Sequence, residues 1–189
     1  MHGFQLWANL PSALKMTDPR YQDIAGNDVP QIIDDDGTVV KIITGNFWGK
    51  AGPVDGIAAD PLFLDVSIPP NGRKTLPVDT RANAFAYVFA GQGSFVDAST
   101  PVGVRVEKEV AGEELNIRDM TGNRTLVRFG NGDDVTVQAG PDGVRFLLIA
   151  GRPLQEPVAW HGPIVMNTRA ELQQAMRVLQ NGNFIQAAH

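Results

Sequence analysis

The sequence predicts an antiparallel β sandwich or barrel followed by a single α-helix. About eight short apolar or alternating segments lie between Thr38 and Ala150, and Gly- and Pro-containing turns separate them. The chain of 189 residues contains 20 glycines and 13 prolines, which is typical of a turn-rich globular protein. Because strands joined by short turns pair with their neighbours, we expect an antiparallel sheet and not a parallel α/β sheet.

The expected strands show the alternation of side chains that a pleated sheet requires. They cover residues 39–43, 62–68, 84–89, 94–96, 102–106, 126–129, 135–137 and 144–150. Gly91-Gln92-Gly93 is expected to be a hairpin turn, since it lacks the third glycine and the following helix of a nucleotide-binding loop. Asn131-Gly132 is expected to be a tight turn between the two strands on either side of it.

The predicted helix begins at a capping box, Thr168-Arg169-Ala170-Glu171. Apolar residues then recur at helical spacing, and Asn181-Gly182 supplies a stop signal. The apolar positions are Leu172, Ala175, Met176 and Leu179. This stripe needs a surface to cover, and the sequence leaves open which surface that is.

Composition excludes several classes of function. The 16 basic and 21 acidic side chains give a net charge of -5, which argues against direct binding of nucleic acid or of an anionic membrane surface. No apolar run approaches the ~18 residues that span a bilayer, and the first ten residues lack the layout of a signal peptide. The absence of cysteine excludes disulfides, thiolate metal sites and a cysteine nucleophile, and it fits a cytoplasmic location.

The three histidines, His2, His161 and His189, leave little for imidazole chemistry. His161 could act as a base or bind a ligand, but we favour a structural role in which it donates to a backbone carbonyl and fixes the turn at Gly162-Pro163. His2 and His189 lie at the ends of the chain and are expected to be mobile.

Two further groups of residues have a functional and a structural interpretation. The run Asp34-Asp35-Asp36-Gly37 could bind a hard cation, but it lacks calcium-loop spacing and is expected to be a solvated loop. Trp7, Trp48 and Trp160 could line a pocket for a planar ligand such as a flavonoid. Packing in the core or in an interface is the more frequent role of such indoles, and exposure of Trp7 and Trp160 would mark an interaction surface.

Three long stretches of the chain resemble the pirin family, whose members are two-domain cupins. They are residues 2–11 with 15–22, residues 146–158, and residues 161–168. The resemblance covers nearly the whole chain, is weakest between about residues 98 and 124, and fits the C-terminal portion of a pirin. It implies a cupin-type, jelly-roll-like antiparallel β-barrel over residues 37–160. Residues 1–36 then resemble the end of the N-terminal cupin, and residues 161–189 form a tail with the helix.

The resemblance also implies where a metal would bind. In metal-binding pirins the N-terminal cupin holds one iron-class ion through three histidines and a glutamate, upstream of the segment that residues 2–7 match. None of these four ligands can be carried onto a position of this sequence. A metal site in the second cupin would need two histidines two positions apart on one strand, yet residues 73–77, where they are expected, and all of residues 38–160 contain none. We therefore expect no metal site, no cofactor site and no catalytic residue in this chain.

Three functional hypotheses follow from the resemblance. The first is a metal-free, non-catalytic binding or interaction module. The second is part of a metal-dependent quercetin 2,3-dioxygenase whose catalytic half is supplied outside this chain. The third is regulation through protein partners, because some pirins are transcriptional cofactors or bind metabolic enzymes.

The ends of the chain predict an interaction surface. In two-domain pirins we expect residues 1–29 and the helix over residues 168–181 to contact the first cupin. Without that cover, each exposed side chain forgoes about 1.5–3 kcal/mol of burial free energy. The side chains concerned are Leu6, Trp7, Leu10, Met176 and Leu179. We expect homodimerisation through these segments, ahead of folding of the ends onto the chain's own barrel or disorder of the ends.

Overall fold

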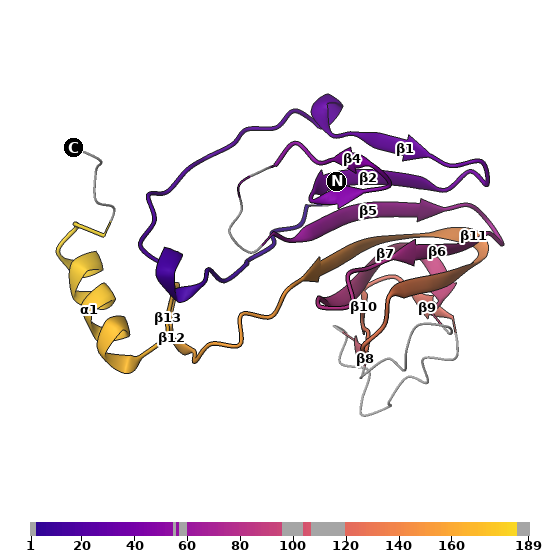
Figure 1. Ribbon diagram of the computed structural model, residues 1–189. Helices are drawn as coiled ribbons and strands as arrows, with labels where there is room; N and C mark the ends of the chain where they lie inside the picture. Colours follow the sequence, from indigo (N-terminus) through magenta and orange to yellow (C-terminus); the bar gives the residue numbers. More distant parts are fainter. Residues whose placement is uncertain (1–2, 55, 57–59, 96–103, 107–119, 185–189) are drawn as a thin grey trace. The chain divides into compact units, whose positions relative to one another are not determined.

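The computed structural model describes residues 3–54, 56, 60–95, 104–106 and 120–184 (Figure 1). The chain divides into two compact units. Unit 1 combines Met1–Asp23 with Leu154–His189, and unit 2 comprises Ile24–Pro153. The nine-stranded sheet lies in unit 2 and the α-helix lies in unit 1 (Figure 1).

Unit 2 contains one short 3₁₀-helix and eleven strands among its described residues. The 3₁₀-helix is η2 (Gly26–Asp28), and the strands are β1 (Gln31–Ile33), β2 (Val39–Thr44), β3 (Asn46–Phe47), β4 (Lys50–Ala51), β5 (Leu62–Ile68), β6 (Arg73–Pro77), β7 (Asn83–Ser94), β8 (Val104–Val106), β9 (Thr121–Gly122), β10 (Thr125–Arg128) and β11 (Asp134–Gly151). Within the described residues, nine of these strands form one antiparallel sheet, and β3 and β4 form a separate pair.

The longest strand, β11, organises this sheet. The strand order is β1-β2-β5-β11-β7-β10-β8, with β6 paired to β11 and β9 paired to β7. Residues 134–138 of β11 pair with β6, and residues 144–150 pair with β5. On its other edge, residues 138–139 and 144–151 of β11 pair with β7. The antiparallel β fold with one C-terminal helix that the sequence predicts is therefore confirmed.

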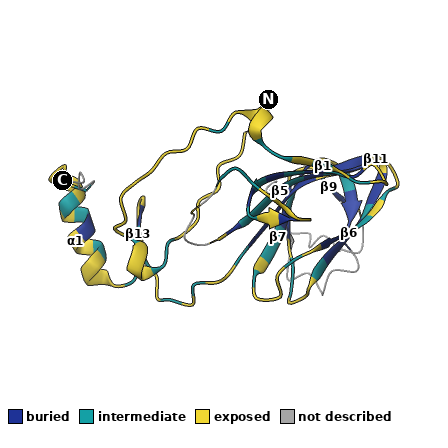
Figure 2. Cartoon of the chain, turned by 45° about the horizontal axis from the view of Figure 1, so that its top comes forward, coloured by how far each residue is buried: buried dark blue, intermediate teal, exposed yellow. Residues whose placement is uncertain are grey.

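Strand alternation builds one core from β2, β5, β6, β7, β10 and β11. Along β5, for example, Leu64, Val66 and Ile68 are buried, and the residues between them are less buried. The largest fully buried side chains of this core are Phe95, Phe146, Ile42, Leu64, Ile68, Leu76, Leu148, Val40, Val66, Val88, Val127 and Val135. Because six strands direct apolar side chains to one shared core, their inward faces enclose it, and Figure 2 shows these strands as the most buried part of unit 2.

The outward face of β5, β7 and β11 carries a second apolar cluster. Phe89, Leu147 and Ile149 are its buried members, with three aromatic side chains of β5 and β7 packed against them. At its edge Arg145 forms a bidentate pair with Asp65, with N···O distances of 2.9 and 2.5 Å, and its guanidinium lies 5.0 Å from the Phe89 ring centroid. The two faces of these strands therefore belong to different clusters.

The hairpin turn expected at Gly91-Gln92-Gly93 is wrong, because β7 continues through these residues as a single strand. Gly91 has a positive φ of 65°, and the register against β11 shifts between Ala139 and Val144. A β-carbon at Gly91 would lie 2.2 Å from the carbonyl oxygen of Gly143. The glycines thus permit an irregular, close approach of two strands, which produces the same sequence signal as a turn.

The tight turn expected at Asn131-Gly132 is also wrong. The strands on either side of it do not pair with each other: β10 pairs with β7 and β8, and residues 134–138 pair with β6. Neither Asn131 nor Gly132 has the positive φ that the two-residue turn requires. The segment instead crosses from one strand pair to another.

Unit 1 is built from the two ends of the chain. Its described elements are η1 (Ser12–Leu14), β12 (Ala159–His161), β13 (Ile164–Met166) and α1 (Arg169–Gln180). The predicted capping box is confirmed: the backbone N–H of Glu171 donates to Thr168 Oγ1 at 3.2 Å, and that of Thr168 donates to Glu171 Oε2 at 2.7 Å. The helical stripe covers β13, since Ala175 packs with Ile164 and Met166.

We expect Gly91→Ala to lower the free energy of unfolding by about 3 kcal/mol, because the new methyl group meets backbone and φ is strained. Gly122→Ala is the matched control: Gly122 lies on β9, has no positive φ and has no atom within 4 Å of an added β-carbon. Urea unfolding followed by circular dichroism measures both variants. Equal stability of the two would contradict the close approach of β7 and β11.

Candidate functional site

The first place where a site could lie is the interior of unit 2. The side chains that β5 and β11 direct into this interior are apolar. The inward residues of β5 and β11 are valine, leucine, isoleucine, phenylalanine and alanine. A metal site in this cupin would need a histidine pair on β6, and the fully buried residue of β6 is Leu76. Among the described residues, no three His, Cys, Asp or Glu side chains come together as a metal-binding group. The residues present here do not fit an iron-class ion.

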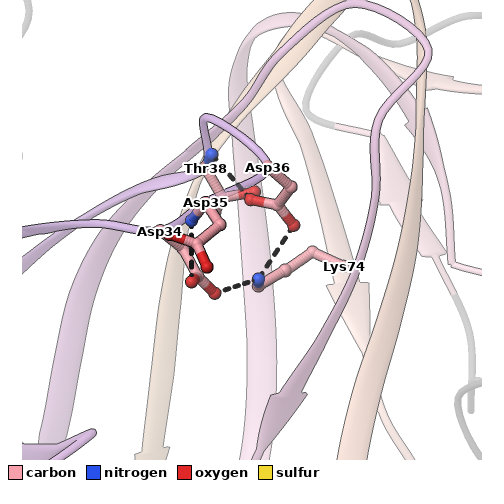
Figure 3. Close-up of polar contacts among 5 residues, drawn as sticks. All are labelled: Asp34, Asp35, Asp36, Thr38 and Lys74. Atoms are coloured by element: carbon pink, nitrogen blue, oxygen red, sulfur yellow. Dashed lines mark hydrogen bonds and ion pairs between the residues drawn. The ribbon is translucent and has the colours of Figure 1, made fainter.

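A polar cluster lies outside this core, where β6 meets the loop between β1 and β2 (Figure 3). The Lys74 ammonium donates to Asp36 Oδ2 at 2.8 Å and also to Asp34 Oδ2. Backbone N–H groups complete the arrangement, since Asp35 donates to Asp34 and Thr38 donates to Asp36. The expectation of a simple solvated loop is therefore incomplete: two of the three carboxylates are ordered around one ammonium ion. We call Asp34, Asp36 and Lys74 the lysine clamp.

The lysine clamp shifts the acidity of its carboxyl groups. The hydrogen bond from Lys74 is the main reason why the pKa of Asp36 falls from 3.8 to about 2, and the Thr38 N–H adds to it. The same ammonium lowers the pKa of Asp34. The clamp also reaches an aromatic residue, because Lys74 Nζ lies 5.1 Å from the ring centroid of Trp48.

In unit 1 the two chain ends form an apolar groove of about 560 Å³. Its principal side chains are Trp7, Leu10, Val158, Trp160, Ile164 and Met166. Trp7 and Trp160 are each 71% exposed. Ser12 ties the N-terminal segment to Glu156 through its N–H at 2.8 Å and its hydroxyl at 3.1 Å, and Asn167 donates to Glu156 at 2.9 Å. We call the apolar groove lined by these side chains, with Trp7 and Trp160 among them, the tryptophan groove.

The three tryptophans belong to two different units of the structure. Trp7 and Trp160 lie together in the tryptophan groove, and Trp48 lies in unit 2 and is 37% exposed. Within its own unit none of the three indoles is buried in a core, so the expected role of packing in a core is not met, and packing in an interface stays a prediction.

Among the described residues, His161 does not form the hydrogen bond to a backbone carbonyl that we expected to fix the turn at Gly162-Pro163. It is exposed at the end of β12, and the Trp160 indole N–H donates to the Gly162 carbonyl at 2.7 Å instead. His2 and His189 lie outside the described residues.

The described part of the chain contains no helix that is both long and apolar enough to cross a membrane.

The sheet defines a cupin-type antiparallel β fold. A solved structure of quercetin 2,3-dioxygenase from Acinetobacter baumannii aligns with 94% of this chain and 55% of its own chain, with a TM-score of 0.76 and 27% sequence identity. The family profile described as the pirin C-terminal cupin domain matches residues 63–185. The protein therefore belongs to the pirin family and corresponds to its C-terminal portion.

Two curated relatives show how much of a pirin this chain spans. A pirin-like protein of Caulobacter vibrioides is 40% identical over 97% of this chain and 59% of its own length. Pirin-1 of Arabidopsis thaliana is 36% identical over 95% of this chain and 57% of its own length. The chain thus spans less than two thirds of the length of each of these two relatives.

We expect Lys74→Met to raise the pKa of Asp36 from about 2 to its ordinary 3.8 or above, because an ammonium is lost and two carboxylates remain close together. Carboxyl ¹³C chemical shifts measured from pH 7 to pH 1.5 report this change. A depressed folded-state pKa contributes stability above pH 3.8 that is lost as the pH falls through about 2. The variant should therefore lose this part of the acid dependence of unfolding.

Lys41→Met is the control, because Lys41 lies on β2 outside the lysine clamp. It should leave the titration of Asp36 unchanged. An unchanged pKa of Asp36 in Lys74→Met would show that the clamp does not form in solution.

Proposed function

We propose that this chain is a metal-free cupin module that acts by binding and docking, without a catalytic centre of its own. The apolar interior of unit 2 is the observation that carries this proposal. A cupin metal site needs imidazole and carboxylate side chains directed inward, and the inward positions of β5 and β11 hold hydrocarbon side chains. The sequence supports the same proposal, because residues 38–160 contain no histidine.

The proposed docking surface is the tryptophan groove of unit 1, and its proposed occupant is a second copy of this chain. Large apolar side chains are exposed along both segments that build unit 1, including Trp7, Met16, Val158, Trp160 and Leu179. Exposed apolar groups concentrated in this way are typical of interfaces. A cytoplasmic homodimer of this kind would act as a regulatory cofactor through its remaining surface.

A second candidate function is part of a metal-dependent quercetin 2,3-dioxygenase. It is favoured by the likeness to the solved enzyme of that name, of which this chain covers 55%. By the pirin resemblance, the iron-class ligands are expected in the portion of a pirin that this chain does not match. Under this hypothesis the tryptophan groove would receive a polypeptide that carries the catalytic cupin, and the isolated chain would remain inactive.

We expect the purified chain to hold less than about 0.1 mole each of iron, nickel or zinc per mole, because its inward side chains offer no suitable ligands. Elemental analysis by mass spectrometry measures this after expression in metal-supplemented medium. Addition of Fe²⁺ and quercetin under air should cause no loss of flavonol absorbance above that of Fe²⁺ alone. Near-stoichiometric metal, or turnover by the chain alone, would refute the metal-free module.

We expect the chain to sediment as a dimer at micromolar concentration and Trp7→Ala or Trp160→Ala to weaken the dimer at least tenfold, since each removes a large apolar contact. Sedimentation velocity over a dilution series measures the dissociation constant. Tyr21→Ala is the control in the same unit, because Tyr21 is 88% exposed but does not line the tryptophan groove.

A monomer at all concentrations would contradict the proposed homodimer. A stable one-to-one complex with a separate polypeptide that carries the remaining length of a pirin would favour the dioxygenase alternative. Unchanged dimerisation in both tryptophan variants would place the interface elsewhere.

A further inference from the structure

A cavity of about 430 Å³ lies in unit 2, at the end of the sheet where several strands begin or finish. β2 and β11 finish there, β5 begins there, and the turn from β6 to β7 forms part of its wall. Its lining includes Asn46, Phe47, Trp48, Asp60, Asp79 and Arg152. Cavities of several hundred Å³ that combine an aromatic face with a few polar groups are the usual form of small-molecule sites.

The aromatic wall of this cavity is held in a defined orientation. The rings of Trp48 and Phe47 lie 4.6 Å apart between centroids, and Phe47 is only 4% exposed. The Lys74 ammonium lies over the Trp48 ring and is itself fixed by the two carboxylates of the lysine clamp. An indole that is supported in this way offers a flat surface with little loss of side-chain freedom when a ligand binds.

The polar wall carries balanced charges and unused hydrogen-bonding groups. Asp79 accepts from Arg81 at 2.8 and 3.0 Å and from Arg152 at 3.3 Å, so its carboxylate is neutralised within the protein. The Arg152 side chain remains 56% exposed and keeps N–H donors for another partner. Among the described residues, the side chains of Asp60 and Asn46 form no hydrogen bond. The cavity therefore presents a carboxylate acceptor, an amide and guanidinium donors together.

Backbone strain marks the same place. Trp48 has φ of 44° and Asp60 has φ of 42°, both in the left-handed region. A bulky residue such as tryptophan seldom adopts this conformation, and such strain is concentrated at ligand sites. At both positions the strained residue is one that lines the cavity.

We propose that this cavity binds a neutral, ring-shaped, polyhydroxylated molecule of the monosaccharide class. The ring would stack on Trp48, and its hydroxyls would donate to Asp60 and accept from Arg152 and Asn46. Hydroxyl groups both donate and accept, which matches this mixed set. A neutral ligand matches the charge balance, because the two aspartates of the wall are offset by Arg152 and the adjoining Arg81. This inference is independent of the proposed docking and metal-free functions.

The experiment uses the full chain and three probes: D-glucose, D-galactose and D-mannose, each titrated to 50 mM. We expect at least one sugar to shift the Trp48 indole ¹H–¹⁵N resonance, with a dissociation constant of about 1 mM. Trp48→Asn should weaken binding at least tenfold, and asparagine is chosen because it tolerates a positive φ. Asp60→Asn, which keeps the shape of the side chain, should weaken binding severalfold.

Controls separate this site from other effects. Tyr21→Ala, in unit 1, should leave sugar binding unchanged, because Tyr21 lines neither this cavity nor the tryptophan groove. Lys74→Met should weaken binding about threefold and also shift the unliganded Trp48 indole resonance, which identifies Lys74 as a positioning residue. If Trp48→Asn fails to fold, Asp60→Asn and chemical-shift mapping of Asn46 and Arg152 test the same site. Absence of shifts at these residues up to 50 mM, or tighter binding of glycine or succinate than of every sugar, would overturn the proposal.

Discussion

The length of β11 is the constraint on which the rest of unit 2 depends. Its 18 residues pair with β6 in the first half, with β5 in the second half and with β7 along the opposite edge. A strand that serves three partners must bend, and the irregular register beside Gly91 and Gly143 provides the bend without breaking the strand. The enclosed core follows, because the bend lets one strand contribute inward side chains to both halves of the sheet.

An enclosed core determines where chemistry can take place. Phe146 and Leu148 of β11 fill the space between the strands with hydrocarbon, and the inward positions of β5 do the same. Close packing of this kind stabilises the scaffold. The lysine clamp and the cavity beside Trp48 both lie outside this packed core.

The sequence predicted the local features and missed those that depend on distant residues. The capped helix and β5 were predictable because their signals lie within a few consecutive residues. The roles of Gly91 and of Asn131-Gly132 were not, because a bulge and a crossing between strand pairs use the same residues as a turn. The lysine clamp joins residues 38 and 40 positions apart, so adjacency of the aspartates alone could not reveal their partner.

The pairing of the two chain ends also depends on contacts between residues far apart in the sequence, and it determines which side chains stay exposed. Residues 154–184 form only a small core around Ile164, Met166 and Ala175, and Ser12 joins residues 3–23 to this segment through its hydrogen bonds to Glu156. A unit built in this way keeps large apolar side chains exposed, whereas the strand ends of unit 2 expose charges and one supported indole. Since these surfaces differ in chemistry, apolar docking and binding of a polar small molecule can be gained or lost separately in this fold.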